Sequence, residues 1–140
     1  MSAREEAQRV FVDTSAWYAL NASDDESHDE ARDKMRALLA EKTALYTSSL
    51  VMQETYTLLR MRRGYSAAFR FVEAAAASPR LEVIRFREVD EEGSYDLLRR
   101  FADHHFSFVD AASFVTMKER RIRHAFAFDD DFAVAGFSLV

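Results

Sequence analysis

The order of apolar segments constrains the fold of this chain more than any other feature. Short runs rich in branched and aromatic residues alternate with longer segments whose apolar residues recur every three or four positions. The short runs are typical of buried strands, and the longer segments are typical of amphipathic helices. Strands are predicted at residues 10–12, 44–47, 81–86 and 125–128, with a short final strand at 137–140.

The residues between these strands supply helix boundaries. Helices are predicted to begin near Ser27, at Ser48 or Ser49, at Ser66, at Asp90 and at Ser107. Ser27 with Glu30, and Ser107 with Asp110, have the spacing of a capping box. Gly64 is expected to end the second helix. The order β-α-β-α-α-β-α-α-β, with short connections, predicts an α/β fold with a mostly parallel central sheet and helices on both faces.

Composition narrows the class of protein further. A length of 140 residues predicts a single domain spanning residues 1–140, in which residues 1–8 form a polar N-terminal extension. Three glycines and one proline disfavour a turn-rich all-β fold, and the absence of cysteine excludes disulfides, thiolate zinc sites and cysteine nucleophiles. No apolar run is long enough to span a bilayer, and the polar N-terminus does not resemble a secretory signal. A cytoplasmic protein is therefore expected.

Four acidic residues occupy positions that differ from those of ordinary surface charges. Asp13 and Asp129 directly follow predicted strands, whereas Glu54 and Asp110 lie in the first turns of predicted helices. In an open parallel sheet, the carboxyl ends of strands and the amino ends of the following helices meet at one edge, where ligands bind. Four carboxylates there would repel one another unless a cation lay between them. Ligands that are all oxygen suit Mg²⁺ or Mn²⁺.

Each of these acids also has a structural explanation on its own. Asp110 fits a helix cap, Asp13 and Asp129 fit turns after strands, and Glu54 fits a solvated helix face. The four positions together favour a metal site, because independent placement of all four at one edge is improbable.

The basic residues form two arginine clusters despite a formal net charge of −5. One cluster follows Glu54 and the other follows Asp110; their members are Arg60, Arg62 and Arg63, and Arg120, Arg121 and Arg123. Cations at helix carboxyl ends are favourable in themselves. Arginine also grips phosphate with two hydrogen bonds, so both clusters are candidate RNA contacts. The net charge by itself argues against a nucleic-acid partner, but bound divalent ions would offset part of it locally.

Four short segments resemble the PIN-domain nucleases in their order and spacing. They are Val-Asp-Thr-Ser at residues 12–15, Ser-Ser-Leu-Val-Met-Gln-Glu at 48–54, Phe-Ser-Phe-Val-Asp-Ala at 106–111 and Phe-Ala-Phe-Asp-Asp-Asp-Phe at 126–132. The last two segments, with the ending at 132–137, look most like the VapC-type toxins of bacterial toxin–antitoxin pairs. The resemblance covers about residues 9–140. It implies a three-layer α/β/α sandwich and a hydrolase, namely a Mg²⁺- or Mn²⁺-dependent endoribonuclease that cleaves RNA phosphodiester bonds.

The resemblance also implies roles for individual residues. Asp13, Glu54, Asp110 and Asp129 match the acidic quartet that is catalytic and binds metal in the family, and Asp131 is an alternative or additional ligand. Ser15 matches the residue that supports the first aspartate, and Thr14 takes the position between them. The partners implied are an RNA substrate, a second copy of the chain in a homodimer, and a cognate antitoxin protein.

Two other functions remain open at the level of sequence. A phosphoryl-transfer domain of the receiver type also gathers acids at a sheet edge, but it needs a lysine after a strand, and Lys118 lies within a predicted helix. A PIN-like fold without activity, serving as a binding module, is the second alternative. The presence of all four acids favours the nuclease over this module.

Overall fold

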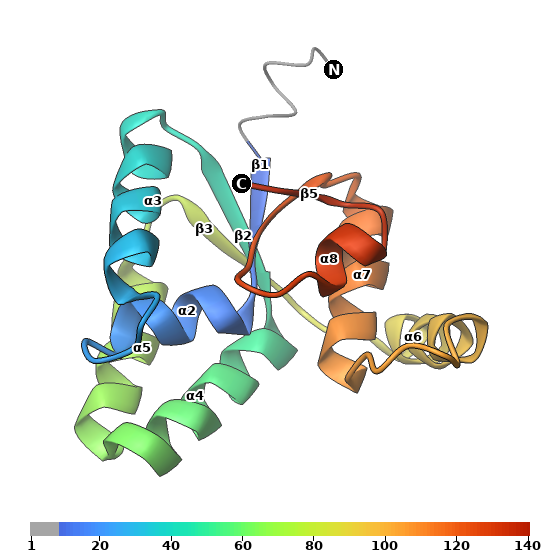
Figure 1. Ribbon diagram of the computed structural model, residues 1–140, viewed down its shortest axis with the longest axis horizontal. Coiled ribbons are helices and arrows are strands. Elements are labelled where there is room, and N and C mark those ends of the chain that lie inside the picture. The colour runs from blue at the N-terminus through green and yellow to red at the C-terminus, as the bar shows by residue number, and fades with distance from the viewer. Residues whose placement is uncertain (1–8) are drawn as a thin grey trace.

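The computed structural model describes residues 9–140, which form a five-stranded sheet with helices on both faces (Figure 1). The strands are β1 (Arg9–Val12), β2 (Ala44–Ser48), β3 (Leu81–Ile84), β4 (His124–Phe126) and β5 (Ser138–Leu139). They lie in the order β3-β2-β1-β4-β5, and every neighbouring pair is parallel. The predicted α/β fold is confirmed. The predicted extension at residues 1–8 lies outside the described part of the chain.

The helices divide between the two faces of the sheet. Within residues 9–140 they are α2 (Thr14–Asn21), α3 (His28–Ala40), α4 (Ser49–Arg63), α5 (Tyr65–Ala77), α6 (Glu88–Arg100), α7 (Phe108–Arg120) and α8 (Asp131–Val134). In Figure 1, α2 to α5 lie on one side of the sheet and α6 to α8 on the other, which gives three layers. None of these helices combines the length and the apolar character needed to cross a membrane.

The strand order creates a crevice between β1 and β4. After β1 the chain places β2 and β3 on one side, and then returns to place β4 and β5 on the other side of β1. In sheets of this kind the connections on either side of the reversal leave toward opposite faces, and ligands bind at the carboxyl ends of the strands there. Asp13 directly follows β1, and Asp129 lies shortly after β4. The reversal therefore brings both acids to one place.

The aromatic core fixes the segment that carries the last acids. Phe132 of α8 is almost completely buried. Its ring lies 4.9 Å from that of Phe114 in α7 and 6.4 Å from that of Phe11 in β1, measured between centroids. Burying an aromatic ring stabilises the fold by about 2 kcal/mol or more. Residues 129–131 are thus held between β4 and an anchored helix.

Two helices were not predicted from the sequence. The helix α2 has eight residues, of which Thr14, Ala16, Trp17 and Ala19 are buried, so it shows no alternation of apolar and polar faces. The helix α8 has only four residues. Both are too short for a helical period to be visible in the sequence.

Two predicted capping interactions are wrong and three boundary predictions are confirmed. Ser27 is the N-cap residue of α3 as expected, but its side chain accepts no capping hydrogen bond, and its backbone N–H donates to Asp25 rather than to Glu30. Asp90 is the third residue of α6, where its carboxylate accepts the backbone N–H of the residue before the helix. Ser48 caps α4, Ser107 with Asp110 forms the predicted capping box of α7, and Gly64 ends α4 with a φ of 94°.

Candidate active site

Asp13 is held at the end of β1 by a hydroxyl that joins two strand ends. Its carboxylate accepts the Ser15 hydroxyl at 2.8 Å and the Ser15 backbone N–H at 3.2 Å. The same hydroxyl oxygen accepts the backbone N–H of Phe128 at 3.0 Å. The backbone N–H of Asp13 donates to the carbonyl of Phe126 at 3.0 Å. Ser15 therefore fixes the orientation of Asp13 and ties the turn after β1 to the segment after β4.

Asp110, Asp129 and Asp131 are also oriented by local hydrogen bonds. In the capping box of α7, the carboxylate of Asp110 accepts the Ser107 backbone N–H at 3.0 Å. The carboxylate of Asp129 accepts the backbone N–H of Asp131 at 3.1 Å. The side chain of Asp131 lies within hydrogen-bonding reach of Asp110. We call Asp13, Asp110, Asp129 and Asp131 the aspartate cluster.

The charges of the aspartate cluster act on one another. Burial raises the pKa of Asp13 to about 7; the hydrogen bonds from Ser15 oppose this rise, and the nearby charges of Asp129 and Asp110 add to it. Burial also raises the pKa of Asp110 and of Asp129, and in both cases the charge of Asp131 contributes. Only 4% of the surface of Asp13 is exposed. Acids from the ends of β1 and β4 and from α7 therefore share one electrostatic environment.

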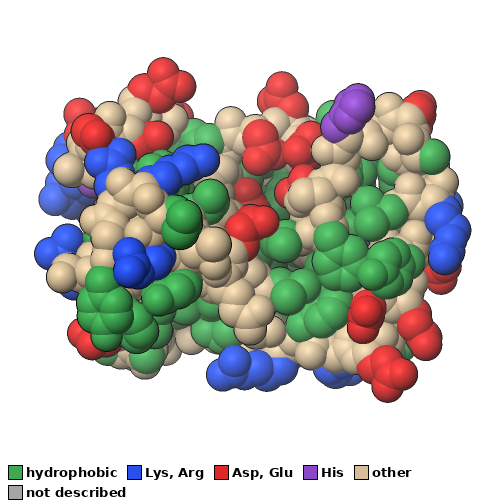
Figure 2. Space-filling model, turned by 90° about the horizontal axis from the view of Figure 1, so that it is seen from below, with side chains coloured by type: hydrophobic (Ala, Val, Ile, Leu, Met, Phe, Trp, Pro, Cys, Tyr) green, Lys and Arg blue, Asp and Glu red, His purple; other side chains and the backbone are tan. Residues whose placement is uncertain are grey.

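The surface around the cluster differs in charge from one side to the other. Figure 2 looks onto the carboxyl ends of the strands, where acidic side chains gather in the middle of the face. Lysine and arginine side chains lie toward the α2–α4 side, and a hydrophobic patch lies toward the α6–α7 side. The acidic centre is therefore bordered by positive charge on one side and by apolar surface on the other.

Glu54 lies in the second turn of α4 and is partly exposed. Within residues 9–140, no hydrogen bond or ion pair joins it to the aspartate cluster. Residues four apart share a face of a helix, so Glu54 lies on the same stripe of α4 as Leu58 and Arg62. Leu58 and Arg62 line a hollow together with Ser15, the partner of Asp13.

The cluster offers an all-oxygen donor set. No group of three or more histidine, aspartate or glutamate side chains in the described residues has the geometry to hold a metal ion as it stands. A cation at this edge would nevertheless remove the mutual repulsion that contributes to the raised pKa values. Carboxylate oxygens are the ligands that hard divalent cations prefer. The residues present therefore fit Mg²⁺ or Mn²⁺ in their chemistry, without a preassembled coordination shell.

Comparison with known proteins shows the family of the chain. The sequence matches the PIN domain family over residues 10–138. The chain belongs to the PIN-domain family. It is 41% identical over 132 residues to the 23S rRNA-specific endonuclease VapC20 of two strains of Mycobacterium tuberculosis, a match that covers 91% of this chain and 95% of that protein.

Solved structures give the same result. The crystal structure of Mycobacterium tuberculosis VapC20, a sarcin–ricin loop cleaving toxin, matches this PIN domain with a TM-score of 0.83 and 38% identity over 91% of this chain and 95% of that one. VapBC2 from Rickettsia felis, bound to a DNA fragment from its promoter, shares the fold, with a TM-score of 0.70 and 15% identity over 94% and 97% of the two chains. The predicted family and function, a PIN-domain endoribonuclease toxin of the VapC type, are confirmed.

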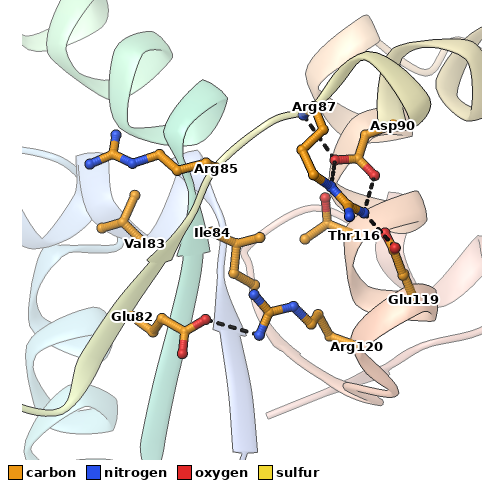
Figure 3. Close-up of a pocket in the computed structure, with 9 residues that line it drawn as sticks. All are labelled: Glu82, Val83, Ile84, Arg85, Arg87, Asp90, Thr116, Glu119 and Arg120. Atoms are coloured by element: carbon orange, nitrogen blue, oxygen red, sulfur yellow. Dashed lines mark hydrogen bonds and ion pairs between the residues drawn. The ribbon is translucent and has the colours of Figure 1, made fainter.

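The two arginine clusters occupy opposite edges of this PIN domain. Arg120 ends α7, and Arg121 and Arg123 precede β4, so all three lie at the amino end of that strand. Arg120 is bonded to Glu82 at 2.9 Å (Figure 3). The aspartate cluster lies at the carboxyl end. The second cluster can therefore contact RNA only at a distance from the acids.

The hollow beside Arg120 has a volume of about 580 Å³. Figure 3 shows that Arg87 from the start of α6 reaches both Asp90 and Glu119. Arg120 is likewise paired with Glu82. Arg87 and Arg120 are thus each bonded to a carboxylate, so their N–H groups are less available to a phosphate.

The first arginine cluster lies on the side of the PIN domain that carries the aspartates. Arg60 is exposed, and Arg63 forms an ion pair with Asp24. The guanidinium of Arg62 lies over the ring of Tyr18, 5.2 Å from its centre. Sequence reasoning missed Tyr18 because it lies in the unpredicted helix α2. The signal that was available is its position three residues after Ser15, one helical turn away from the residue that holds Asp13.

The supporting position Thr14 is buried. Its hydroxyl oxygen has no hydrogen-bond partner within residues 9–140. Most buried hydroxyls in folded proteins have a hydrogen-bond partner, and the buried hydroxyl of Thr43, next to the amino end of β2, also lacks one within these residues. Thr14 lies between Asp13 and Ser15 in the sequence.

Proposed function

We propose that this PIN domain cleaves RNA with the help of Mg²⁺ or Mn²⁺ held by Asp13, Glu54, Asp110 and Asp129, with Asp131 as an additional ligand. The observation that carries the proposal is the convergence of the aspartate cluster at the reversal between β1 and β4, where burial and neighbouring charges raise the pKa of three of its members. A bound divalent cation would offset the mutual repulsion of such a cluster at neutral pH.

The chain's own residues would do three things in this reaction. Ser15 and Ser107 hold the carboxylates of Asp13 and Asp110 in fixed orientations through the hydrogen bonds described above. The backbone N–H of Asp131 does the same for Asp129. When bound, a divalent ion would neutralise charge on the scissile phosphate and lower the pKa of the attacking water. The protein would supply orientation and negative charge, and no side-chain nucleophile is required.

The substrate and the partners are proposed from the relatives. VapC20 is named as specific for 23S rRNA and as cleaving the sarcin–ricin loop. Because the identity of 41% extends over nearly the whole of both chains, we take a stem-loop of 23S rRNA as the substrate of this protein. A cognate antitoxin belongs to the same proposal and is supported by the VapBC2 assembly of a structural relative. A homodimer and a location in the cytoplasm are proposed together with it.

The first test is cleavage of a synthetic sarcin–ricin stem-loop RNA. Wild-type protein is expected to cleave it with Mg²⁺ or Mn²⁺ and to stop in excess EDTA. Asp13→Asn and Asp110→Asn are expected to lower the rate at least about 100-fold, because each removes a charged ligand. Asp96→Asn is the matched control, since Asp96 is an exposed residue paired only with Arg99. A folded Asp13→Asn or Asp110→Asn protein that cleaves at the wild-type rate would contradict the proposal.

The second test separates the nuclease from an inactive binding module. Millimolar Mn²⁺ is expected to raise the melting temperature of the wild-type protein, since a ligand that binds only the folded state stabilises it. The same addition should raise the melting temperature of the Asp13→Asn protein less, and that of the Asp96→Asn protein as much as wild type. A module without a metal site would show no shift in any of the three.

A further inference from the structure

A hollow of about 330 Å³ adjoins the aspartate cluster. We call it the Arg62 hollow; its lining includes Thr14, Ser15, Tyr18, Leu58, Arg62 and Phe128. These residues come from the first two turns of α2, from α4 and from the segment after β4. Ser15 and Phe128 are also the residues whose hydrogen bond joins the two strand ends around Asp13. The hollow and the acidic site therefore share a wall.

We propose that the Arg62 hollow binds one unpaired nucleotide of the RNA next to the bond that is cut, and that Arg62 binds the phosphate of this nucleotide. The inference rests on the proposed function, since the nucleotide is placed relative to the aspartate cluster. Arg62 is a binding and positioning residue in this proposal, because it lies outside the cluster.

The surroundings of Arg62 leave its N–H groups available. Within residues 9–140 the guanidinium forms no ion pair, and its contact is the face of the Tyr18 ring at 5.2 Å. A ring face contacts the plane of a guanidinium and leaves the N–H donors at its rim free. The neighbouring Arg63 differs, because it is bonded to the carboxylate of Asp24 and to the hydroxyl of Tyr18. Arg62 and Arg63 thus both lie against Tyr18, and within residues 9–140 Arg63 alone of the two has a carboxylate partner.

The face of α4 relates Arg62 to the acidic site. Glu54, Leu58 and Arg62 are spaced by four residues and lie along one stripe, and α4 packs against α2. Arg62 lies about 12 Å along the helix from Glu54, at 1.5 Å per residue. A short stretch of single-stranded RNA can span that distance, so one phosphate can lie at the acidic site while another phosphate of the same strand lies within reach of the Arg62 side chain.

The remaining lining restricts how a nucleotide would lie. Asp25 and Glu26 also border the hollow, and their carboxylates would repel a phosphate. The phosphate therefore belongs beside Arg62, and donors such as the ribose 2′-hydroxyl or the amino groups of a base suit the two carboxylates. Phe128 and Leu58 offer apolar contacts to a base. A volume of about 330 Å³ is at the lower end for ligand pockets, which suits a single nucleotide rather than a duplex.

The test measures kcat and KM for the sarcin–ricin stem-loop RNA at several salt concentrations. Arg62→Gln is expected to raise KM about 5- to 20-fold while kcat changes less than about twofold, because a phosphate contact is lost away from the reacting atoms. The slope of log KM against log salt concentration is expected to decrease by about 0.7 to 0.9, the value for one phosphate contact. Arg62→Lys should restore part of the lost affinity. Arg36→Gln, at an exposed arginine of α3, is the matched control and should behave as wild type.

The outcomes separate the two proposals. If wild-type protein does not cleave the RNA with either metal ion, the proposed function is wrong, and binding of the same RNA measured by fluorescence anisotropy still decides the Arg62 hollow. Equal KM, equal affinity and equal salt slopes for Arg62→Gln and Arg36→Gln overturn the hollow while leaving cleavage intact. Unchanged RNA binding together with weakened binding of a cognate antitoxin would assign the hollow to a protein and would also overturn the inference.

Discussion

At the scale of a single residue, burial of the ionised Asp13 carboxylate lowers the stability of the fold. The carboxyl group is almost fully buried, and the nearest hydrogen bonds that favour its ionised form come from Ser15 alone. Burial raises its pKa to about 7, and Asp129 and Asp110 act in the same direction. At neutral pH without a cation, the folded chain therefore holds a charge that the unfolded chain carries more easily.

The stability of the metal-free protein is expected to depend on pH through Asp13. The pKa is about 7 in the folded chain and about 4 in the unfolded chain, so the folded state binds the proton more tightly. The contribution of Asp13 to the free energy of unfolding is then greatest at low pH, decreases as the pH rises from about 4 to about 7, and stays constant above that. Asp13→Asn cannot ionise and keeps an oxygen acceptor for Ser15. In EDTA its melting temperature should exceed that of wild type by about 3 °C or more at pH 8, with little difference near pH 4. The same difference at both pH values would contradict this account.

Removing the Ser15 hydroxyl is expected to affect both stability and cleavage. Ser15→Ala leaves the backbone N–H of Phe128 without its acceptor and removes a donor to Asp13. The free energy of unfolding, measured with urea, should decrease by about 1 to 3 kcal/mol. Ser66→Ala, at an exposed position of α5, should change it by less than about 0.5 kcal/mol. Cleavage should decrease only in the Ser15 variant, measured at a temperature where both proteins are folded.

The site residues that could be identified from the sequence are those that lie close to the end of a predicted strand. Asp13, Ser15 and Asp129 lie within a few residues of predicted strands, so their positions at the carboxyl edge follow from parallel pairing. The Arg62 hollow was not predictable, because its wall depends on the contact between α2 and α4, and α2 left no periodic signal.

At the scale of elements, a helix boundary could be predicted where one residue by itself begins or ends the helix. Ser48 and Gly64 limit α4 as expected, since each satisfies the helix end with its own side chain or its own φ. The expected capping box of Ser27 and Glu30 does not form, and the backbone N–H of Ser27 that Glu30 would accept donates to the carboxylate of Asp25. At α6, Arg87 precedes the helix and Asp90 bonds back to it, which moves the start of the helix two residues earlier than expected. Competition among neighbouring polar groups decided both cases.

The two glycines at helix positions are expected to respond oppositely to alanine. Gly64 has a φ of 94°, so Gly64→Ala is strained although an added Cβ would meet no atom within 4 Å. It should lower the free energy of unfolding by about 1 kcal/mol or more. Gly93 lies inside α6, and an added Cβ would contact Val115 at 3.4 Å. Gly93→Ala should be neutral or raise the free energy of unfolding by up to about 1 kcal/mol. Urea denaturation measures both, and changes of the same sign would contradict the reasoning.

Strand order is the property of the whole molecule that the sequence did not supply. The alternation of strands and helices predicted parallel pairing, but it left the order β3-β2-β1-β4-β5 undetermined. That order places the ends of β1 and β4 side by side and separates the two arginine clusters. It also resolves the conflict between a net charge of −5 and a nucleic-acid substrate. Acids gather at the centre of the carboxyl edge, and Arg62 lies beside them. The net charge of the whole chain hides this local separation of negative and positive charge.

Packing across the molecule is expected to control activity through Phe132. This ring contacts Phe114 and Phe11 and anchors α8, which begins at Asp131, two residues after Asp129. Phe132→Leu should lower the free energy of unfolding by about 1 to 2 kcal/mol and should also lower the rate of cleavage at a temperature where the protein is folded. Phe69→Leu is the matched control, since Phe69 contacts Tyr56 and Tyr65, far from the acids in the sequence. Similar rates of cleavage in the two variants would show that α8 does not hold the acids in place.

The hydrogen bond between Ser15 and Phe128 joins residues 113 positions apart. During synthesis on the ribosome, the segment that carries Asp13 emerges long before the segment that carries Asp129. Until β4 and α8 have emerged and docked beside β1, the growing chain has only one side of its acidic centre. The strand order thus delays assembly of the acidic site, because most of the polypeptide must leave the exit tunnel before Asp13 and Asp129 can come together.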